Sequence, residues 1–450
     1  MQTETMTNGD KKSDPKDKFR SPLLNFPTML SRVKRKFRFL AERGNALVVR
    51  HHLLALCLCF LGIVDGSSQD FEWVRQFGAL PSGPAVDEAL ATAARDGNIY
   101  VVGSTGGIFA GEGSVGATDA FLRKHDASGN VLWTRQFGTA FADVATAVSV
   151  DSTGIYVAGY ADGVFPGQSS PGGRDAFVRK YDADGNVIWT RQFGTFSTDF
   201  ASAILADSTG VYVAGFAYSL TAALPGQTSS GGLFDAFLRK YSSDGVEIWT
   251  RQFGSNGDDA AAGIGVDSTG VYVVGEVGGA LPGQTSAGGH RDAFVRKYDG
   301  GGTEVWTRQF GTTAYDSVTT IAVDSTGVYL AGLTDGILPG QTSAGSRDAF
   351  ARKYDADGNI VWTRQFGTSG VDQGSGISVD SGAVYVTGTV GVGGALPGQT
   401  SVGGSDAFLR RYDADGNIVW TRQFGFRGQT SLLTVCMFVV YRAHASPSAY

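Results

Sequence analysis

The sequence predicts an all-β protein, a β-propeller of four-stranded blades, and three observations support this. Between the copies of a repeated six-residue motif lie short runs rich in Val, Ile, Tyr, Phe and Thr and bounded by Gly, Asp or Ser. This is the pattern of strands and hairpins. The repeats show no helical periodicity. A repeat of 56 to 60 residues cannot bury its own apolar face, so neighbouring copies must stack. The motif Trp-(Thr/Val)-Arg-Gln-Phe-Gly marks the copies and begins at Trp73, Trp133, Trp189, Trp249, Trp306, Trp362 and Trp420. We expect this repeated tryptophan to lie on the outer strand and to pack between blades, where a large aromatic side chain is well buried.

One copy, residues 201–254, shows the elements in order. An apolar run is followed by a tight turn at 207–210 and a second run at 211–215. A long Gly-rich loop then leads to a third run at 235–241, and a Ser-Ser-Asp-Gly turn leads to a fourth at 247–253. We name these strands a, b, c and d. Four antiparallel strands per 40 to 60 residues are typical of a propeller blade.

A family resemblance follows from the ordered elements of this copy. The string from Asp175 to Trp189, Asp-Ala-Phe-Val-Arg-Lys-Tyr-Asp-Ala-Asp-Gly-Asn-Val-Ile-Trp, is followed by Phe-Gly at 193–194, by Asp199 and by Asp-Ser-Thr-Gly-Val-Tyr-Val-Ala-Gly at 207–215. This pattern resembles the SBBP family, the seven-bladed β-propeller repeat, over about residues 71–425. The resemblance implies a propeller fold and a surface or exported protein, and it implies no particular activity.

The strand count predicts six complete blades plus a partial seventh. There are seven d strands but six of each other kind, and residues 71–77 form a d strand with no partners before it. Propellers often close their ring by pairing such an N-terminal outer strand with the last blade. The apolar stretch 432–441 matches no repeat. Either it replaces inner strands of blade seven, or the chain is truncated or mis-spliced and the ring closes imperfectly or with six blades.

The two ends of the chain differ in charge. Residues 1–52 hold 12 Lys and Arg against 5 Asp and Glu, whereas residues 53–450 hold 25 against 38. We expect 1–52 to be a basic, disordered region, 67–425 to be the repeat array and 426–450 to be an atypical tail. An acidic array lacks the basic stripe that binds phosphate backbones, so we expect no nucleic-acid partner.

Residues 53–66 form a hydrophobic, signal-peptide-like or anchor segment. The apolar run between Leu53 and Val64 is too short for a spanning helix but fits a signal-peptide core. We therefore expect an extracellular or cell-surface protein, with a possible membrane tether through this run. A mitochondrial-type address and cytosolic retention stay open.

Residue patterns for chemistry are weak in this sequence. The three cysteines lie outside the array, and the five histidines form no pair at metal-ligand spacing. Turns such as Asp-Ala-Asp-Gly-Asn at 182–186 match hairpin turns better than a calcium loop. Arg179 and Arg191 recur with Asp175 and Asp199, which suggests structural pairing. We expect no catalytic residue, cofactor or metal.

Candidate ligand-binding residues are those that break the repeat. In a propeller the b–c and d–a loops share one face, and here they are irregular and carry aromatic residues, which recognition surfaces use. The alternative is that these side chains only cap the channel or pack on neighbouring loops. The candidates are Tyr160, Phe216, Tyr218, Glu276 and His290 from b–c segments, and Phe141, Phe196 and Tyr315 from d–a segments.

The sequence therefore predicts a monomeric binding module for a glycan or protein ligand. A second hypothesis is a polysaccharide lyase or glycosidase, for which two carboxylates with separated pKa values are needed. A third is a structural surface protein. The carboxylates considered for the enzyme, expected at the channel mouth, are Asp199, Asp258, Asp259, Asp316 and Asp372.

Overall fold

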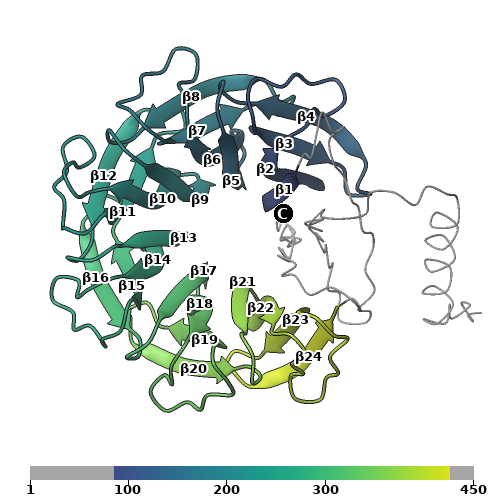
Figure 1. The fold of residues 1–450 in the computed structure, drawn as a ribbon, viewed down its shortest axis with the longest axis vertical. Helices are drawn as coiled ribbons and strands as arrows, with labels where there is room; N and C mark the ends of the chain where they lie inside the picture. The colour runs from purple at the N-terminus through teal and green to yellow at the C-terminus, as the bar shows by residue number, and fades with distance from the viewer. Residues whose placement is uncertain (1–85, 426–450) are drawn as a thin grey trace, which may run out of the picture. The chain divides into compact units, whose positions relative to one another are not determined.

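The computed structural model describes residues 86–425, which fold into six four-stranded antiparallel sheets arranged as the blades of a propeller (Figure 1). This confirms the predicted all-β propeller of four-stranded blades. The predicted partial seventh blade, at 71–77 and 432–441, lies outside the described residues. So do the segments 1–52 and 53–66 and the tail 426–450. Among residues 86–425, no helix is long and apolar enough to cross a membrane.

Each blade uses four consecutive strands, the first innermost and the fourth outermost (Figure 1). Blades 1 to 3 comprise β1 (Asp87–Arg95), β2 (Asn98–Thr105), β3 (Asp119–His125), β4 (Val131–Phe137); β5 (Asp143–Val150), β6 (Ile155–Ala161), β7 (Asp175–Tyr181), β8 (Val187–Phe193); and β9 (Asp199–Asp207), β10 (Gly210–Tyr218), β11 (Phe234–Tyr241), β12 (Glu247–Phe253). Blades 4 to 6 comprise β13 (Ala260–Asp267), β14 (Gly270–Val277), β15 (Asp292–Tyr298), β16 (Glu304–Phe310); β17 (Asp316–Asp324), β18 (Gly327–Thr334), β19 (Asp348–Tyr354), β20 (Ile360–Phe366); and β21 (Gln373–Asp380), β22 (Ala383–Val390), β23 (Asp406–Tyr412), β24 (Ile418–Phe424).

An aspartate closes the c–d turn in five of the six described blades, and Ser242 takes its place in blade 3. In blade 2, the Asp182 N–H donates to the Asn186 carbonyl (2.9 Å) and the Gly185 N–H donates to the Asp182 carbonyl (3.1 Å). Gly185 has a φ of +79°, a left-handed conformation that favours glycine. The Asp182 carboxylate accepts the N–H groups of Asp184 and Asn186. The repeated acidic turn therefore has hairpin chemistry, as the sequence predicts.

Tryptophan and arginine of each outer strand join one blade to the next. Trp189 Nε1 of blade 2 donates to the Ser243 carbonyl (3.0 Å) and Arg191 Nε donates to the Gly245 carbonyl (2.7 Å), both in the c–d turn of blade 3. The indole packs directly on Gly245, where a Cβ would lie 2.7 Å from the ring. The prediction that the repeated tryptophan packs between blades is confirmed. The same two bonds occur at the junctions that start from Trp133, Trp249, Trp306 and Trp362.

The suggested pairing of the repeated arginines with the repeated aspartates is wrong. Arg179 Nε donates to Thr190 Oγ1 (2.9 Å), and its guanidinium stacks on the rings of Phe137 and Phe165 at 4.5 and 4.4 Å. The outer-strand arginines bond to turn carbonyls instead, as Arg191 does. Arg179 and Arg191 thus fix geometry between blades by directional hydrogen bonds and, for Arg179, cation–π contact. The equivalents of Arg179 in blades 3 and 4, Arg239 and Arg296, also lie 3.4 Å from the glutamates Glu247 and Glu304.

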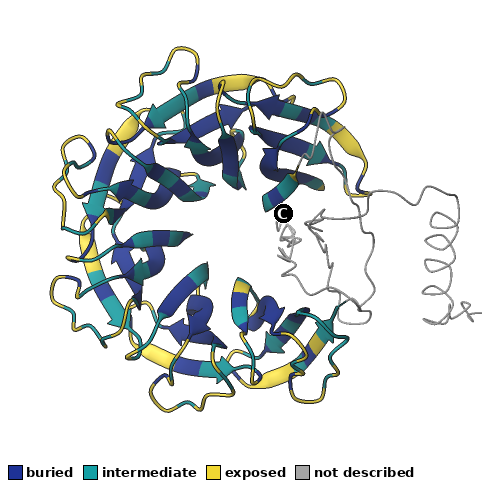
Figure 2. Ribbon diagram, in the orientation of Figure 1, coloured by how far each residue is buried: buried dark blue, intermediate teal, exposed yellow. Residues whose placement is uncertain are grey.

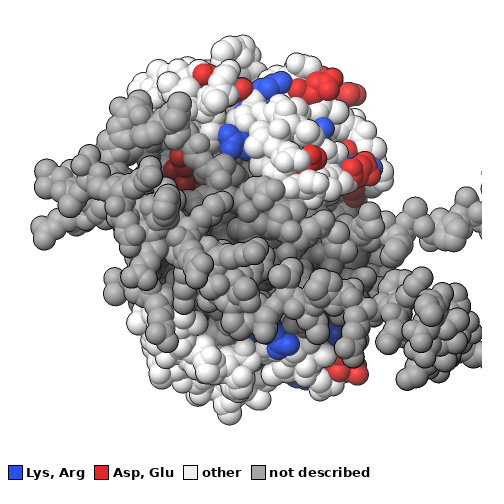
Figure 3. Space-filling model, turned by 90° about the vertical axis from the view of Figure 1, so that its right-hand side faces the viewer, with Lys and Arg blue, Asp and Glu red and all other residues white. Residues whose placement is uncertain are grey.

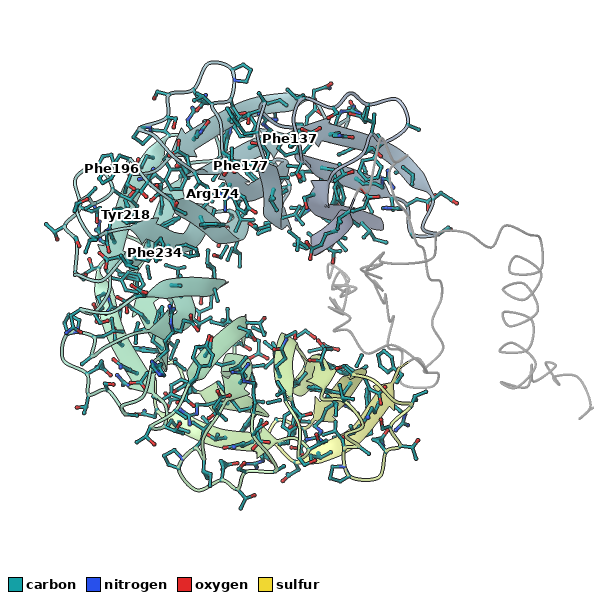
Figure 4. All side chains as sticks on the ribbon, in the orientation of Figure 1. Phe137, Arg174, Phe177, Phe196, Tyr218 and Phe234 are labelled. Carbon is teal, nitrogen blue, oxygen red and sulfur yellow. The ribbon has the colours of Figure 1, made fainter. Side chains whose placement is uncertain are left out.

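Aromatic side chains fill the space between blades. Phe137 of blade 1 meets Phe177 of blade 2 edge to face, with centroids 5.9 Å apart (Figure 4). Phe193 of blade 2 meets Phe237 of blade 3 in the same way at 5.5 Å. Figure 2 shows buried residues through the middle of each blade and exposed residues on the outer strands and loop tips. The core is therefore a series of inter-blade layers.

The outer strand edges are capped by side chains. In blade 2, the Gln192 N–H donates to Oε1 of Gln168 in the b–c loop (3.1 Å), and Arg191 Nη1 donates to the Thr190 carbonyl (2.8 Å). The Gln and Arg caps recur in every other described blade, with Glu112 replacing the loop glutamine in blade 1. Capping blocks strand pairing with other chains. It also ties each b–c loop across its blade, which fixes the loop face described next.

Candidate functional site

The b–c and d–a loops lie side by side on one face of the array, which we call the loop face. Arg174, at the end of a b–c loop, forms a parallel bridge with Thr198 in the adjacent d–a loop. The Asp199 N–H donates to the Arg174 carbonyl (2.8 Å). Arg291 with Tyr315 and Arg347 with Val371 form equivalent bridges. The prediction that the b–c and d–a loops share one face is confirmed. The b–c loops are more regular than predicted, because the same turn recurs in five of them, closed by the N–H groups of Gln168, Gln227, Gln284, Gln341 and Gln399.

Several predicted binding residues are strand residues and not loop residues. Tyr160 lies in β6, Phe216 and Tyr218 in β10, and Glu276 in β14, and all four are half-buried. Strand β10 continues to Tyr218 because Phe216 pairs with Phe200 and Tyr218 pairs with Phe234. Side chains on paired strands are held more rigidly than loop side chains.

Four of the eight predicted residues come together in one group, the aromatic patch, which spans blades 2 and 3. Its members are Tyr160, Phe196, Phe200, Phe216, Tyr218 and Phe234.

The six rings of the aromatic patch form a continuous chain of contacts. Tyr160 meets Phe200 edge to face at 4.5 Å, and Phe200 stacks on Phe216 at 4.7 Å. Phe216 meets Phe234 at 5.2 Å, and Phe234 meets Tyr218 at 6.2 Å. Phe196, which is 53% exposed, completes the chain at 5.5 Å from Tyr218. Figure 4 labels Phe196, Tyr218 and Phe234 close together on this part of the array.

Arg174 covers one end of the aromatic patch. Its guanidinium carbon lies 4.3 Å from the Tyr160 ring centroid and 5.0 Å from that of Phe200. The two carboxylate oxygens of Asp162 accept hydrogen bonds from Arg174, one from Nε at 2.5 Å and one from Nη2 at 3.0 Å. This bidentate bond raises the pKa of Arg174 further above its usual value, and the pair contributes no net charge. The patch therefore presents fixed, uncharged ring surface.

Sequence reasoning missed Phe200, Phe234, Arg174 and Asp162. Phe200 lies in the inner strand β9, and Phe234 directly precedes the repeated Asp-Ala-Phe of strand c. Aligning the repeats with one another shows that Phe234 breaks the pattern. At the position of Phe234, blades 4 and 5 carry Arg291 and Arg347.

A second, polar cluster occupies the equivalent place between blades 4 and 5 and contains two more predicted residues. The Tyr315 hydroxyl donates to Glu276 Oε2 (2.5 Å), and Glu276 Oε1 pairs with Arg291 Nη1 (2.5 Å). Burial, followed by this hydrogen bond, raises the pKa of Tyr315 to about 12. Asp258 lies 3.8 Å from the same arginine. The polar and charged groups of this cluster are therefore hydrogen-bonded or ion-paired with one another.

The remaining two predicted residues stand apart from the patch. His290 is exposed beside Arg291. Phe141 is 60% exposed in the d–a loop between blades 1 and 2, against Gly163. The structure thus brings together four of the eight candidates, places two in the polar cluster and leaves two separate.

The carboxylates considered for catalysis are structural, except Asp258. Asp199, Asp259 and Asp316 have no exposed surface and Asp372 is 1% exposed. Each accepts the backbone N–H four residues earlier at 2.6 Å, which closes the d–a loop. Burial raises the pKa of Asp199 to about 6. Buried groups that already hold the loops cannot reach a polysaccharide. Within residues 86–425, no three His, Cys, Asp or Glu side chains gather as a metal site.

Comparison with known proteins places these features in context. The regulatory protein FlaEY of Caulobacter vibrioides is 25% identical over 370 residues, which cover 73% of this chain and 38% of that protein. The chain thus spans well under half of that relative's length. The β-propeller domain of the Trilobed protease from Pyrococcus furiosus has a TM-score of 0.41 at 8% identity, covering 76% of this chain and 99% of that chain. A putative 6-phosphogluconolactonase from Bacteroides uniformis has a TM-score of 0.39 at 11% identity, covering 74% and 84%.

Two segments of the chain, residues 132–166 and 305–339, match the SBBP family, described as a beta-propeller repeat. They run from the outer strand of one blade to the inner and second strands of the next, so they cover the junctions described above. The protein is therefore a β-propeller in which two segments match the SBBP beta-propeller repeat.

Proposed function

We propose that this protein is a binding module that engages a glycan or a protein through the aromatic patch on its loop face. The observation that carries the proposal is the chain of six touching rings at one blade junction, with Arg174 and Asp162 neutralising each other at its end. Half-exposed aromatic rings on a rigid scaffold supply large contact area at little entropic cost. The same positions elsewhere in the array lack such a chain.

The aliphatic rim of the patch extends the surface available to a ligand. Leu220 and Leu233, at the two ends of the b–c loop of blade 3, are 56% and 45% exposed. Exposed apolar residues that adjoin one another, unlike scattered ones, indicate an interaction site. Figure 3, which views the array from the side away from the patch, shows charged residues of both signs on the described surface. Because Arg174 and Asp162 neutralise each other at the end of the patch, a neutral ligand surface fits it best.

An interaction role is also supported by the similarity to a protein named as regulatory, FlaEY. We further propose an extracellular or cell-surface location, from the hydrophobic run between Leu53 and Val64, and a monomeric state. An enzyme acting on polysaccharides is disfavoured by the burial of Asp199, Asp259, Asp316 and Asp372. A structural surface role is the remaining competitor, and it would leave the patch without a ligand.

The test is a binding screen with matched variants. Wild-type protein is immobilised and probed with a panel of glycans and of unfolded and folded polypeptides. The double variant Phe196→Ala/Tyr218→Ala is expected to weaken retention of any ligand by about 1 to 3 kcal/mol, since exposed aromatic anchors contribute that much. Asp184→Ala/Asn186→Ala, on the tight-turn face, is the control and should bind as wild type. Equal retention by both double variants would refute the proposed site.

A further inference from the structure

Each blade junction holds two buried aspartates that face the same glycine. At the junction of blades 3 and 4, Asp235 and Asp259 have no exposed surface. A methyl group added to Gly254 would overlap Asp259 Oδ2 and lie 2.9 Å from Asp235 Oδ1. The two carboxylates therefore converge from the ends of different blades on one backbone position.

These carboxylates hold the loop face together. Asp259 accepts the N–H of Ser255 at 2.6 Å, which closes the d–a loop, and the N–H of Gly278 at 3.1 Å, which begins the b–c loop of blade 4. Asp235 Oδ2 accepts the Ser230 N–H at 2.8 Å, near the end of the b–c loop of blade 3. One aspartate pair thus ties three loop segments.

The pair has no positive charge to balance it. Among the described residues, no lysine or arginine bonds to either carboxylate, and Asp235 Oδ1 is buried without a hydrogen-bond partner. Facing Asp235 from β12 is the neutral amide of Gln252, which donates to its Oδ2 at 2.9 Å. The charged groups beside Asp259 are Asp258 and, on β14, Glu276, and both are engaged by Arg291. Two buried carboxylates without a counter-ion cannot both remain ionised at low cost.

We propose that Asp235 and Asp259 hold one proton between them, so that the loop face is fastened in mild acid and loosened when that proton is lost. The space between the two carboxylates and Gly254 is too small even for a methyl group. A proton, in contrast, neutralises one of the charges without displacing the backbone. Loss of the proton leaves two negative charges against each other and weakens the anchors of Ser255 and Gly278. The pair titrates as a unit.

Independent features agree with this assignment. Burial, with a smaller contribution from the charge of Asp235, raises the pKa of Asp259 to about 7 against the lowering effect of the hydrogen bonds from Ser255 and Gly278. Burial also raises the pKa of Asp235. The arrangement recurs at four other junctions, where the residue pairs are Asp119 with Asp143, Asp175 with Asp199, Asp292 with Asp316, and Asp348 with Asp372.

Hydrogen exchange of the loop amides tests the proposal. In the wild-type chain, protection of the Ser255 and Gly278 amides, corrected for the intrinsic exchange rate, should be constant below about pH 4, the ordinary pKa of an aspartate. Between about pH 4 and 7 it should fall by up to tenfold for each pH unit, because the closed pair holds a proton that it releases on opening, and above about pH 7 it should level off. Asp235→Asn, which keeps the shape and removes the second charge, should reduce the fall. Asp244→Asn, in the exposed turn of the same blade, should leave it unchanged.

Other results would overturn the proposal. Protection that is independent of pH in the wild type, or an unchanged fall in Asp235→Asn, would show that no shared proton fastens the loops. Should Asp235→Asn not fold, Asp259→Asn removes the other member of the pair and must also reduce the fall. Restoration of protection at pH 8 by calcium chloride would assign the gap to a metal ion instead.

Discussion

The junction between blades 2 and 3 and the junction between blades 4 and 5 share a scaffold but differ at the loop face. Both have a tryptophan and an arginine bonded to the next turn, and both have an aspartate pair around a glycine. At the loop ends, however, Phe216, Tyr218 and Phe234 of blade 3 stand where blade 5 has Leu333, Asp335 and Arg347. The repeat fixes how blades join, and the variable positions decide what the surface can bind.

The largest effect is expected from a scaffold tryptophan. Trp249→Ala removes a buried indole and its bond to the Gly300 carbonyl, and should lower the free energy of unfolding by about 3 to 5 kcal/mol. Chemical denaturation measures this loss. Phe196→Ala, at an exposed ring, should change stability by less than about 1 kcal/mol. Similar losses at the two positions would end the distinction between scaffold and surface.

A turn glycine should give the next largest effect. Gly245 and Gly226 have similar φ values, +76° and +73°, but only at Gly245 would a Cβ meet a neighbour, the Trp189 ring at 2.7 Å. Gly226→Ala should cost about 1 kcal/mol from backbone strain, and Gly245→Ala about 1 to 3 kcal/mol more from overpacking. Thermal denaturation of the two variants compares strain with and without the contact. Equal melting temperatures would contradict the inter-blade contact.

The two faces should respond to pH in opposite directions. On the loop face, burial raises the pKa of Asp143 to about 6 and of Asp259 to about 7. The free energy of folding that these two carboxyls contribute is therefore present in acid and is lost as pH rises through these values. On the tight-turn face, hydrogen bonds from Asn186 and Asn359 lower the pKa of Asp182 and Asp355, so that stability is lost as pH falls. The melting temperature should therefore peak near about pH 4, the ordinary pKa of an aspartate, because the first contribution is lost as pH rises from there and the second as pH falls from there. A peak above pH 8 would contradict this balance.

The smallest effect is expected in the polar cluster. Tyr315→Phe removes the hydroxyl that donates to Glu276, but Arg291 continues to hold that carboxylate. The loss of stability should be about 1 kcal/mol or less, since a typical hydrogen bond contributes about that much. Ligand retention should not change. A loss of retention larger than that of Phe196→Ala/Tyr218→Ala would move the site from blades 2 and 3 to blades 4 and 5.

Sequence reasoning predicted the repeated parts of the structure well because their spacing and composition carry direct physical meaning. The four strands of each blade, the aspartate-glycine turns and the packing of the tryptophans follow from periodicity and turn chemistry. The site was less predictable. Tyr160 and Phe216 were expected in loops because each follows a glycine, Gly159 or Gly215, at the end of an apolar run. The backbone nevertheless continues pairing for two residues after Gly159 and for three after Gly215.

Contacts across blades could not be predicted either. Phe200 and Tyr160 are 40 residues apart in sequence and meet only because blade 3 stacks on blade 2. The burial of Asp199 and Asp259 likewise depends on loops from two blades, so one strand alone gave no indication that they would be inaccessible. Both the ring contact and the burial of these aspartates thus depend on packing between blades, which the sequence of one repeat does not show.

The central claim is that the blade 3 substitutions, and not the scaffold, create the binding surface. It is tested most directly by giving blade 3 the loop end of blade 5, through Phe196→Thr, Phe200→Ser, Phe216→Leu, Tyr218→Asp and Phe234→Arg. The affinity of this chain for the ligand returned by the screen is then compared with that of the wild type. We predict a propeller with unchanged β-rich circular dichroism and a loss of affinity of tenfold or more. Wild-type affinity in a folded variant would contradict the account.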